Sequence, residues 1–272
     1  MIIDGKKIAD ELQLELKGLI QKLTPKKPGL AFILVGHHAP SHTYVRMKKK
    51  GCLEVGIYSE TYELEETVSE EELISLIKRC NKNPHIHGIL VQQPLPSHLS
   101  EKKVIEAIDP HKDVDGFHPL NIGKALLGQD DGFLSCTPLG IITLLEKAEV
   151  QVEGKHALIL GRSNIVGKPL ASLLMQKKPH RNATVTVAHS QTTDLENLCK
   201  TADILIAAIG KPLFVKKSFI KKGATVIDVG INILEKDGKK HIVGDVDFEE
   251  VAPLCSRITP VPKGVGPMTI TM

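Results

Sequence analysis

Tyr44 and Lys48 are a pair of side chains whose types and spacing suit chemistry. They stand four residues apart in a segment, about 41–55, that is expected to be helical, so both can point into one cleft. Such a pair suits a planar substrate that is stacked or hydrogen-bonded by the tyrosine beside a positioned amine. The alternative is that Tyr44 and Lys48 are surface side chains without a catalytic role, because lysine is abundant in this chain. We expect Lys49 and Lys50 to be ordinary solvated side chains.

More polar side chains follow the buried strand expected at 87–91. Gln92 stands at the C-terminal end of that strand, the usual rim of a site in an α/β protein, although a glutamine there can simply satisfy backbone groups. Asp113 and Asp115 share a short loop with Gly116. The sequence leaves open whether these acids bind a ligand or only close a turn through side-chain hydrogen bonds.

A glycine turn, Leu160-Gly161-Arg162-Ser163-Asn164-Ile165-Val166-Gly167, connects a buried strand to a helix expected to begin near Val166. Glycines let the backbone approach a pyrophosphate, and a helix N-terminus offers free amides and the positive end of the helix dipole. The spacing is not G-x-G-x-x-G, so the pattern alone is weak and an ordinary strand-to-helix turn fits equally well.

The following strand favours one class of dinucleotide. Val185-Thr186-Val187 runs into Ala188-His189-Ser190 without the carboxylate that binds the ribose 2′-hydroxyl in NAD enzymes. Arg162, Ser163 and Ser190 can instead donate hydrogen bonds to a 2′-phosphate. The sequence therefore favours NADP over NAD.

These residues need elements to position them, and the periodicity predicts an α/β protein with two sheets. The chain has 272 residues, with 42% hydrophobic and only 3% aromatic residues, so its core is built of Ile, Leu, Val and Ala, as is typical of buried parallel sheets. We expect helices at 6–23, about 41–55, 69–81 (with Glu72 at capping-box spacing), 101–108 and 137–147, and strands at 30–35, 58–64, 87–91, 157–160, 185–187, 204–209 and 226–229.

Several other classes of protein are disfavoured. A net charge of +3 is too small to indicate a nucleic-acid or membrane partner. Five cysteines without a Cys-x-x-Cys pair argue against a disulfide framework or zinc ribbon, and His85 and His87 lack a third ligand, so we expect no metal site. Because no apolar run of about 18 residues occurs, we expect a cytoplasmic protein.

The segment 259–269 holds three prolines and two glycines. We interpret it as a loop, which either lines a ligand crevice or forms a mobile tail.

Together these motifs resemble one family, the bifunctional methylenetetrahydrofolate dehydrogenase/methenyltetrahydrofolate cyclohydrolases. The matching segments occur in the family's order over nearly the whole chain: SHTYVRMK (41–48), VQQPLP (91–96), KDVDGF (112–117), CTP (136–138), GRS with VG (161–163 and 166–167), VGI (229–231), and PVP (260–262) through Thr269.

The resemblance implies a two-domain α/β fold. An N-terminal αβα catalytic domain, 1–137, to which 259–272 return, is separated by a cleft from a Rossmann-like doubly wound NADP-binding domain, 138–258. The implied activity is NADP-dependent oxidation of 5,10-methylenetetrahydrofolate to the methenyl form, followed by hydrolysis to 10-formyltetrahydrofolate. Such one-carbon metabolism serves purine, histidine and methionine biosynthesis. The family is usually a homodimer formed through the nucleotide domains.

The resemblance also implies roles for individual residues. Lys48 is essential to hydrolysis, Gln92 orients it, Tyr44 stacks on the folate, and Asp115 binds the amino and ring nitrogens of the pterin. The implied cofactor-binding residues are Gly161, Arg162, Ser163, Ile165, Ser190, Gly210 and Ile231. Further substrate-binding residues are Pro262, Gly264, Gly266 and Pro267, so that 264–269 line the folate cleft.

The sequence departs from the family's pattern at three places. Lys263 stands where the family commonly has Gly, which alters the rim of the cleft. Gln191 stands where a basic residue usually follows Ser190, which removes one charge for the 2′-phosphate. The sequence stops at Met272, where family members usually continue into a final helix, and without that helix we expect weaker docking of the domains.

Two other functions are considered beside the bifunctional enzyme. One is a dehydrogenase with little cyclohydrolase activity, which follows if Lys48 is not correctly poised. The other is a non-catalytic protein that binds NADP or folate. The joint presence of Tyr44, Lys48, Gln92 and Asp115 argues against the non-catalytic protein.

Overall fold

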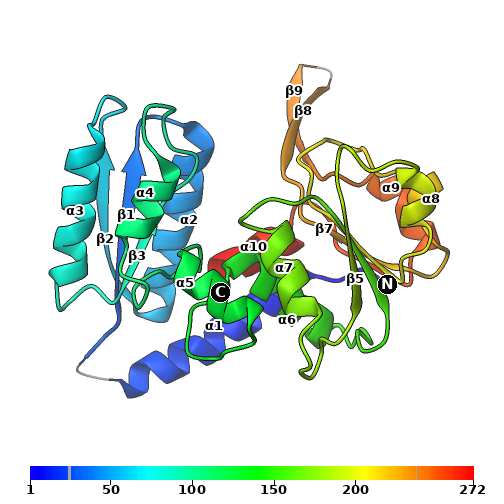
Figure 1. Ribbon diagram of the computed structural model, residues 1–272, viewed down its shortest axis with the longest axis horizontal. Helices are drawn as coiled ribbons and strands as arrows, with labels where there is room; N and C mark the ends of the chain where they lie inside the picture. The colour runs from blue at the N-terminus through cyan, green and yellow to red at the C-terminus, as the bar shows by residue number, and fades with distance from the viewer. Residues whose placement is uncertain (24–25, 237) are drawn as a thin grey trace. The chain divides into compact units, whose positions relative to one another are not determined.

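The computed structural model describes residues 1–23, 26–236 and 238–272 (Figure 1). They form two compact units, which we call the N-terminal unit (Glu11–Leu134) and the C-terminal unit (Met1–Asp10 with Ser135–Met272). The division falls inside the first helix, α1 (Gly5–Lys22). The functional division expected from the sequence, 1–137 with 259–272 and 138–258, concerns ligand binding and stays a prediction.

The N-terminal unit is built on a parallel sheet with the strand order β2-β1-β3. The central strand β1 is an apolar run, and its register places Leu30 opposite Ser59 of β2 and Gly88 of β3. Parallel strands need long crossover connections, and helices supply them here. The elements after α1 are β1 (Gly29–Val35), α2 (Ala39–Val55), β2 (Tyr58–Leu64), α3 (Glu70–Lys82), β3 (Gly88–Val91), α4 (Glu101–Ala107) and α5 (Pro119–Leu126).

Helices cover both faces of this sheet because β1 is apolar on both sides. Ala31, Ile33 and Val35 belong to a core with residues of α3 and α4, whereas Phe32 and Leu34 belong to a core with residues of α2. The α/β class predicted from the sequence is therefore confirmed for this unit.

Local signals set the ends of these helices. Ser69 Oγ accepts a hydrogen bond from the Glu72 amide at 3.2 Å, and the Glu72 carboxylate accepts one from the Ser69 amide at 3.2 Å, which is the predicted capping box. Helix α2 ends at Gly56, whose φ of 92° lies in the left-handed region that favours glycine.

The C-terminal unit is built on a five-stranded parallel sheet with the order β10-β7-β6-β4-β5. The first strand of this sheet, β4, lies between β5 and β6, so the chain turns to opposite sides of β4 in successive crossovers. That reversal creates a crevice at the carboxyl ends of the strands, where open α/β sheets bind ligands. The main elements are α6 (Cys136–Lys147), β4 (His156–Leu160), α7 (Gly167–Leu174), β5 (Thr184–Ala188), β6 (Ile204–Ala207) and β7 (Thr225–Asp228).

The rest of this unit adds a hairpin and short helices. Strands β8 and β9 pair antiparallel and extend from the unit as an arm (Figure 1). The remaining elements are α8 (Leu195–Cys199), η1 (Lys217–Phe219), β8 (Asn232–Lys236), β9 (Lys239–Val243), α9 (Phe248–Val251), η2 (Ala252–Leu254), β10 (Arg257–Ile258) and α10 (Val265–Thr271).

The predicted helices and strands are all present, with shifts of a few residues at their ends. Strand β6 ends at Ala207 rather than at residue 209, since Ile209 and Gly210 turn their amides toward a buried side chain. The expectation of a loop over 259–269 is wrong from Val265 onward, because α10 begins there and Pro267 falls in its first turn, where proline is tolerated. Helix α5, the short helices α8 and α9, the short strand β10 and the β8–β9 hairpin were not predicted.

Within the described ranges, no helix is both long and apolar enough to span a bilayer.

Candidate active site

Three of the predicted catalytic side chains come together in the N-terminal unit. Lys48, on α2, donates a hydrogen bond from Nζ to Oε1 of Gln92 at 3.3 Å, and Gln92 directly follows β3. The Lys48 charge also acts on the Asp115 carboxyl, so Asp115 lies nearby. Tyr44 stands one helical turn before Lys48 on α2, and we call these four residues, Tyr44, Lys48, Gln92 and Asp115, the lysine cluster.

The position of Gln92 is fixed by the end of the sheet. Its amide nitrogen donates to the Ile33 carbonyl of β1 at 2.9 Å, and its side-chain Nε2 donates to the Gln93 carbonyl at 2.7 Å. With Nε2 held in this way, Oε1 is the atom presented to Lys48. Gln92 therefore lies at the predicted rim in contact with the lysine, and the orienting role that the resemblance implies stays a prediction.

The two acids of the 113–116 loop have different surroundings. Asp113 is buried, and its carboxylate accepts hydrogen bonds from the Phe117 amide (3.2 Å), the His118 amide (2.8 Å) and Asn121 Nδ2 (2.8 Å). Asp113 is thus a structural residue of the turn. The Asp115 carboxylate, by contrast, has no hydrogen-bond partner among the described residues, and it remains available to a ligand.

Burial shapes the acid–base state of the cluster. Removal from water raises the pKa of Asp115, the Lys48 ammonium lowers it, and the neighbouring Asp113 raises it. Burial also raises the pKa of Tyr44, so its phenol stays protonated at neutral pH and can donate a hydrogen bond. Lys49 and Lys50 are exposed, as expected of solvated side chains.

The C-terminal unit holds a cavity of about 300 Å³ at the crevice described above. Its lining comes from the carboxyl ends of three adjacent strands, β4, β5 and β6, and from residues that follow them. Four predicted cofactor residues, Gly161, Arg162, Ser163 and Ser190, line it. The other lining residues are Leu160, Ala188, His189, Leu195, Ala208, Ile209, Lys211 and Phe214. We call this space the glycine-turn cavity.

Glycines let the turn after β4 pack closely. Gly161 has a φ of 124°, and a Cβ there would overlap the Ala208 carbonyl. A Cβ on Gly167 would lie 2.9 Å from the Cα of Arg162 and overlap the Gly161 carbonyl. These two glycines thus permit helix α7 to start directly against the turn.

The start of α7 differs from the expectation of free amides. Ser163 Oγ accepts hydrogen bonds from the amides of Val166 (3.2 Å) and Gly167 (3.3 Å), and the Lys168 amide donates to the Ser163 carbonyl at 3.0 Å. Ser163 therefore occupies two amides at the start of α7 and still has its own hydroxyl proton to donate.

The remaining predicted cofactor residues do not line the glycine-turn cavity. Ile165 lies in the exposed part of the turn, and Gly210 lies in the loop after β6, between the lining residues Ile209 and Lys211. Ile231 follows β7, and a Cβ on Gly266 would contact its side chain at 3.6 Å. One predicted cofactor residue thus lies beside one predicted substrate residue.

The last predicted substrate residues form a compact turn in the same unit. A Cβ on Gly264 would overlap the Pro260 carbonyl, and one on Gly5 would overlap the Gly264 carbonyl. The Lys6 amide donates to the Lys263 carbonyl at 3.0 Å, so the N-terminal residues hold this turn. Pro262 begins the turn, and Pro267 lies in the first turn of α10, which packs on α6.

Sequence reasoning missed Lys211 and Phe214 of the cavity lining. The Lys211 ammonium lies 5.5 Å from the centre of the Phe214 ring, within range of a cation–π contact. Gly210, which follows the end of a buried strand as Gly161 does, was the available signal for this second loop.

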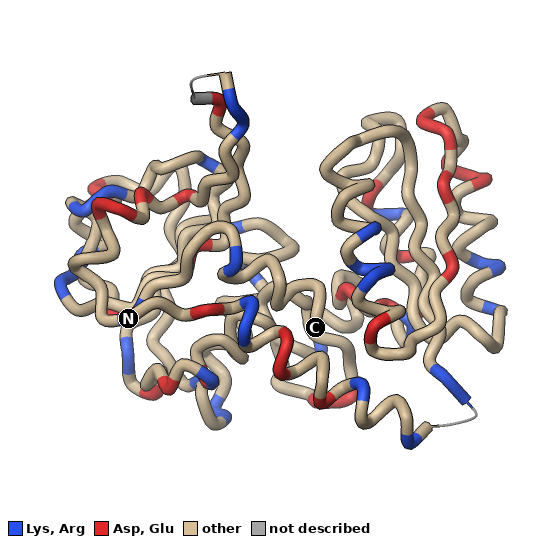
Figure 2. Tube along the Cα trace, turned by 180° about the vertical axis from the view of Figure 1, so that it is seen from behind, with Lys and Arg blue, Asp and Glu red and all other residues tan. Residues whose placement is uncertain are grey.

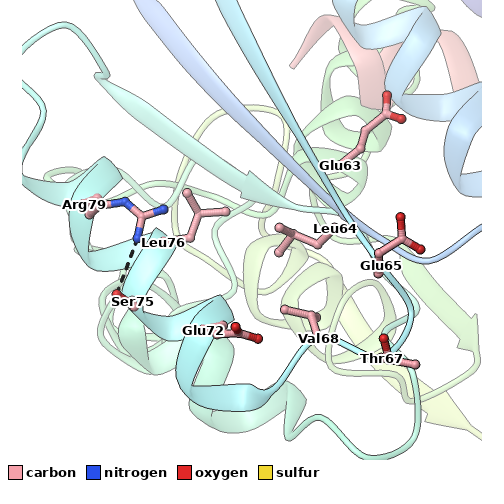
Figure 3. A pocket seen from close by; sticks show the side chains of 9 residues that line it. All are labelled: Glu63, Leu64, Glu65, Thr67, Val68, Glu72, Ser75, Leu76 and Arg79. Atoms are coloured by element: carbon pink, nitrogen blue, oxygen red, sulfur yellow. Dashed lines mark hydrogen bonds between the residues drawn. The ribbon is translucent and has the colours of Figure 1, made fainter.

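A further hollow, of about 560 Å³, lies between β2 and α3 and contains none of the predicted site residues. Figure 3 shows Glu63, Glu65 and Glu72 around it, with Arg79 donating to Ser75 at 3.5 Å. Acidic residues gather where β2 leads into α3 (Figure 2).

The C-terminal unit thus has a doubly wound topology with a ligand crevice at its switch point, and the N-terminal unit carries an amine, an amide and a carboxyl suited to proton transfer and ligand binding. Comparison with known proteins agrees with these descriptions of the two units. Residues 3–115 match the "Tetrahydrofolate dehydrogenase/cyclohydrolase, catalytic domain", and residues 135–272 match the "Tetrahydrofolate dehydrogenase/cyclohydrolase, NAD(P)-binding domain". The chain belongs to the tetrahydrofolate dehydrogenase/cyclohydrolase family.

Individual relatives match over the whole chain. The bifunctional protein FolD of Protochlamydia amoebophila is 57% identical over 275 residues, which cover 100% of this chain and 94% of that protein. The crystal structure of the bifunctional FolD of Campylobacter jejuni has a TM-score of 0.95 and 48% identity, covering 100% of this chain and 94% of that one. The Trypanosoma brucei enzyme, solved with NADP and an inhibitor, has a TM-score of 0.94 and 36% identity, covering 100% and 93%.

Proposed function

We propose that this chain is a bifunctional one-carbon enzyme. It oxidises 5,10-methylenetetrahydrofolate with NADP⁺ to 5,10-methenyltetrahydrofolate, and it hydrolyses that product to 10-formyltetrahydrofolate. The observation that carries the proposal is the contact between Lys48 and Gln92 beside the unpaired carboxyl of Asp115. The relatives named above as bifunctional dehydrogenase/cyclohydrolases support it.

In the hydrolytic step, water adds to the methenyl carbon and loses one proton. The bond from that carbon to one ring nitrogen then breaks while the remaining hydroxyl proton passes to the released nitrogen, which leaves the formyl group. Lys48 is the residue placed to assist these proton movements, and Gln92 holds its Nζ in position. Such assistance contributes a factor of about 10²–10⁴ to a rate.

Asp115 and Tyr44 bind the folate. The pterin presents an amino group and ring N–H groups. A planar carboxylate can accept two hydrogen bonds from such groups at once, one on each oxygen. Because Asp115 has no hydrogen bond to its own chain among the described residues, it is free to accept them. The half-buried Tyr44 ring, one helical turn from Lys48, stacks on the folate and holds the reacting carbon.

The dinucleotide occupies the glycine-turn cavity. NADP⁺ supplies the hydride acceptor, and the chain supplies binding and orientation. Arg162, Ser163 and Ser190 donate to the 2′-phosphate, and among the described lining residues there is no carboxylate to repel that phosphate. Gly210, Ile165 and Ile231 complete the binding residues. The structure of the NADP-bound Trypanosoma brucei relative supports this choice of cofactor.

The turn at 260–267 contributes to the substrate site through Pro262, Gly264, Gly266 and Pro267. The position of Gly266 beside Ile231 supports a role where substrate and cofactor meet. The functional domains are then 1–137 with 259–272 for folate and 138–258 for NADP.

The enzyme works as a cytoplasmic homodimer formed through its nucleotide domains. Support for the homodimer comes from the β8–β9 arm, on which Ile233 and Ile242 are 61% and 53% exposed although they are large and apolar. Surfaces of this kind often mark protein interfaces.

The test follows NADPH and methenyl absorbance together in the wild type and in Lys48→Ala, with methylenetetrahydrofolate and NADP⁺. We expect NADPH from both proteins and accumulation of the methenyl form only in Lys48→Ala, because alanine is a good helix former and spares the fold. Full hydrolysis by the variant contradicts the role of Lys48. Binding of NADP without reduction by either protein supports a non-catalytic binding protein instead.

A further inference from the structure

Two buried acids of the C-terminal unit have no part in the proposed chemistry. Asp228 ends β7 and is 3% exposed, and Asp245 follows β9 and is fully buried. Neither lines the glycine-turn cavity. Burying a carboxylate is costly unless hydrogen bonds satisfy it, so their partners show what they hold in place.

The Asp245 carboxylate holds the loop after β6. Its Oδ2 accepts hydrogen bonds from the amides of Ile209 (2.7 Å) and Gly210 (3.0 Å), and its Oδ1 accepts one from Asn232 Nδ2 (2.9 Å). Ile209 lines the cavity, and Gly210 is a proposed cofactor-binding residue. Three hydrogen-bond donors therefore converge on the Asp245 side chain, which does not itself line the cavity.

The backbone next to Asp245 holds the other end of the same loop. The Leu213 amide donates to the Gly244 carbonyl at 3.0 Å, and the Val215 amide donates to the Asp245 carbonyl at 2.9 Å. Leu213 itself has a φ of 53°, in the left-handed region that side chains rarely adopt, so the loop backbone is strained at this residue. The segment 244–245 thus fixes the loop that carries the lining residues Lys211 and Phe214.

Asp228 in turn holds Asp245. Its Oδ1 accepts from the amides of Gly230 (3.0 Å) and Asp245 (2.9 Å), and its Oδ2 accepts from the Val246 amide (2.9 Å). A Cβ on Gly230 would overlap the Asp245 carboxylate, and a Cβ on Gly244 would overlap that of Asp228. Burial raises the pKa of Asp228 to about 7 although these three amides lower it.

We propose that Asp245 is a positioning residue for the dinucleotide, which fixes the loop 209–215 through the amides of Ile209 and Gly210 while Asp228 holds it in place. This inference rests on the proposed binding of NADP in the glycine-turn cavity. It adds a residue that touches neither substrate nor cofactor but determines the shape of the wall that binds NADP.

A carboxylate suits this position better than an amide. Both carboxylate oxygens accept hydrogen bonds, and the negative charge strengthens the bonds from the loop amides. Asparagine loses that charge, and it keeps both sets of hydrogen bonds only if the side-chain amide of Asn232 turns over to present its oxygen to the new N–H group.

The first variant is Asp245→Asn. We expect the KM for NADP⁺ to rise about tenfold or more, as loss of a charged hydrogen-bond acceptor implies, with the KM for methylenetetrahydrofolate changed less than about threefold. Hydrolysis of methenyltetrahydrofolate supplied directly needs no dinucleotide, and we expect its rate to stay at the wild-type level. A general loss of structure would instead raise both KM values and lower the rate of hydrolysis.

The second variant exchanges the pair, combining Asp245→Asn with Asn232→Asp. The new amide can then accept from the loop through its oxygen and donate to the new carboxylate through its nitrogen, so every hydrogen bond is restored. We expect the KM for NADP⁺ to return to within about threefold of wild type.

Asp247→Asn is the matched control. Asp247 lies two residues further on, and its side chain pairs with Lys216 at 2.7 Å and caps α9 through the Glu250 amide at 3.4 Å. Only its backbone amide contacts the cavity loop, by donating to the Val215 carbonyl at 2.9 Å, and the substitution leaves that hydrogen bond in place. We expect it to lower the melting temperature and leave the KM for NADP⁺ unchanged.

The outcomes separate the two proposals. If wild type does not bind or reduce NADP⁺, the proposed function fails and this inference fails with it. If wild type is active and Asp245→Asn leaves the KM for NADP⁺ unchanged, or Asp247→Asn raises it equally, this inference alone is overturned. Should Asp245→Asn not fold, the exchange variant decides: near-normal NADP⁺ binding supports the inference, and binding weakened tenfold overturns it.

Discussion

The lysine cluster and the glycine-turn cavity are built in opposite ways. In the lysine cluster the working groups are side-chain atoms presented by a helix and a strand end, as the Lys48–Gln92 hydrogen bond illustrates. In the cavity the lining residues stand on backbone turns, which are held by glycines such as Gly161 and by amide hydrogen bonds to Asp245. Substitutions in the first region should therefore change chemistry with little effect on folding, whereas those in the second should change folding and binding together.

The largest effect is expected from Gly161→Ala. The new Cβ would overlap the Ala208 carbonyl at a φ of 124°, so we expect a loss of more than about 4 kcal/mol in unfolding free energy together with loss of NADP binding. Chemical denaturation and fluorescence titration with NADPH measure the two effects.

Gly223→Ala is the control for this prediction. Gly223 also has a positive φ, 85°, but a Cβ there would meet nothing within 4 Å. We expect a loss of only about 1–2 kcal/mol and unchanged NADP binding. Equal losses for the two variants would mean that backbone conformation alone, and not the close approach to β6, determines the role of Gly161.

Asp113 and Asp115 of the 113–116 loop test, within the N-terminal unit alone, the contrast between a side chain that supports folding and one that binds a ligand. Asp113→Ala leaves the Phe117 and His118 amides without their side-chain acceptor and removes one of the two acceptors of Asn121 Nδ2, so we expect a loss of roughly 3 kcal/mol in unfolding free energy. Asp115→Ala removes a carboxyl whose pKa burial raises, so at neutral pH folding is unharmed or slightly improved.

For Asp115→Ala we expect instead a KM for the folate substrate raised by about tenfold or more, with NADP binding nearly intact. Thermal melts and steady-state kinetics on both variants check the pair. Equal loss of folate and NADP binding in Asp115→Ala would place this residue elsewhere than at the pterin.

Arg162→Ala should reduce the preference for NADP⁺ over NAD⁺ by about tenfold, the value of one charged hydrogen bond to the 2′-phosphate. The measurement is the ratio of kcat/KM for the two dinucleotides. Lys168→Ala serves as the control, because Lys168 donates to Asn164 at 2.7 Å and does not line the cavity. An unchanged ratio of kcat/KM values in Arg162→Ala contradicts the proposal that Arg162 binds the 2′-phosphate.

The smallest effect, and a stabilising one, is expected from Lys263→Gly. Lys263 has a φ of 82°, which costs a side chain about 1 kcal/mol, and its side chain is exposed. Glycine relieves that cost, so we expect the melting temperature to rise by about 2 °C in a calorimetric scan. A fall in melting temperature would show that the lysine makes a stabilising contact that outweighs the strain.

Strong local signals made most of the fold predictable. Apolar runs such as β1 and β4 and the Ser69–Glu72 capping box carry their conformation in a few adjacent residues. The β8–β9 hairpin was missed because it lies mostly in solvent and has no hydrophobic periodicity of its own. Helix α10 was missed because its Gly and Pro residues suggest a loop, and its packing on α6 outweighs that preference.

The candidate site was predictable to a different degree in each region. The four-residue spacing from Tyr44 pointed to Lys48, and the end of an expected strand pointed to Gln92, although their contact joins residues 44 positions apart. The distinct surroundings of Asp113 and Asp115 depend on the Phe117 and His118 amides, which no pattern in the loop specifies. Asp245 could not be singled out at all, because its partners at Ile209, Gly210 and Asn232 meet only in the folded unit.

The joining of residues 1–10 to the far end of the chain has a consequence for synthesis on the ribosome. The N-terminal unit is continuous in sequence, so it can fold once residue 134 has emerged. Ile3 and Lys6 find their backbone partners only at Ile258 and Lys263, so the first residues made must wait for almost the last. The entropic cost of closing so long a loop is met most easily when the intervening chain has already folded, which places the sealing of the C-terminal unit at the end of folding.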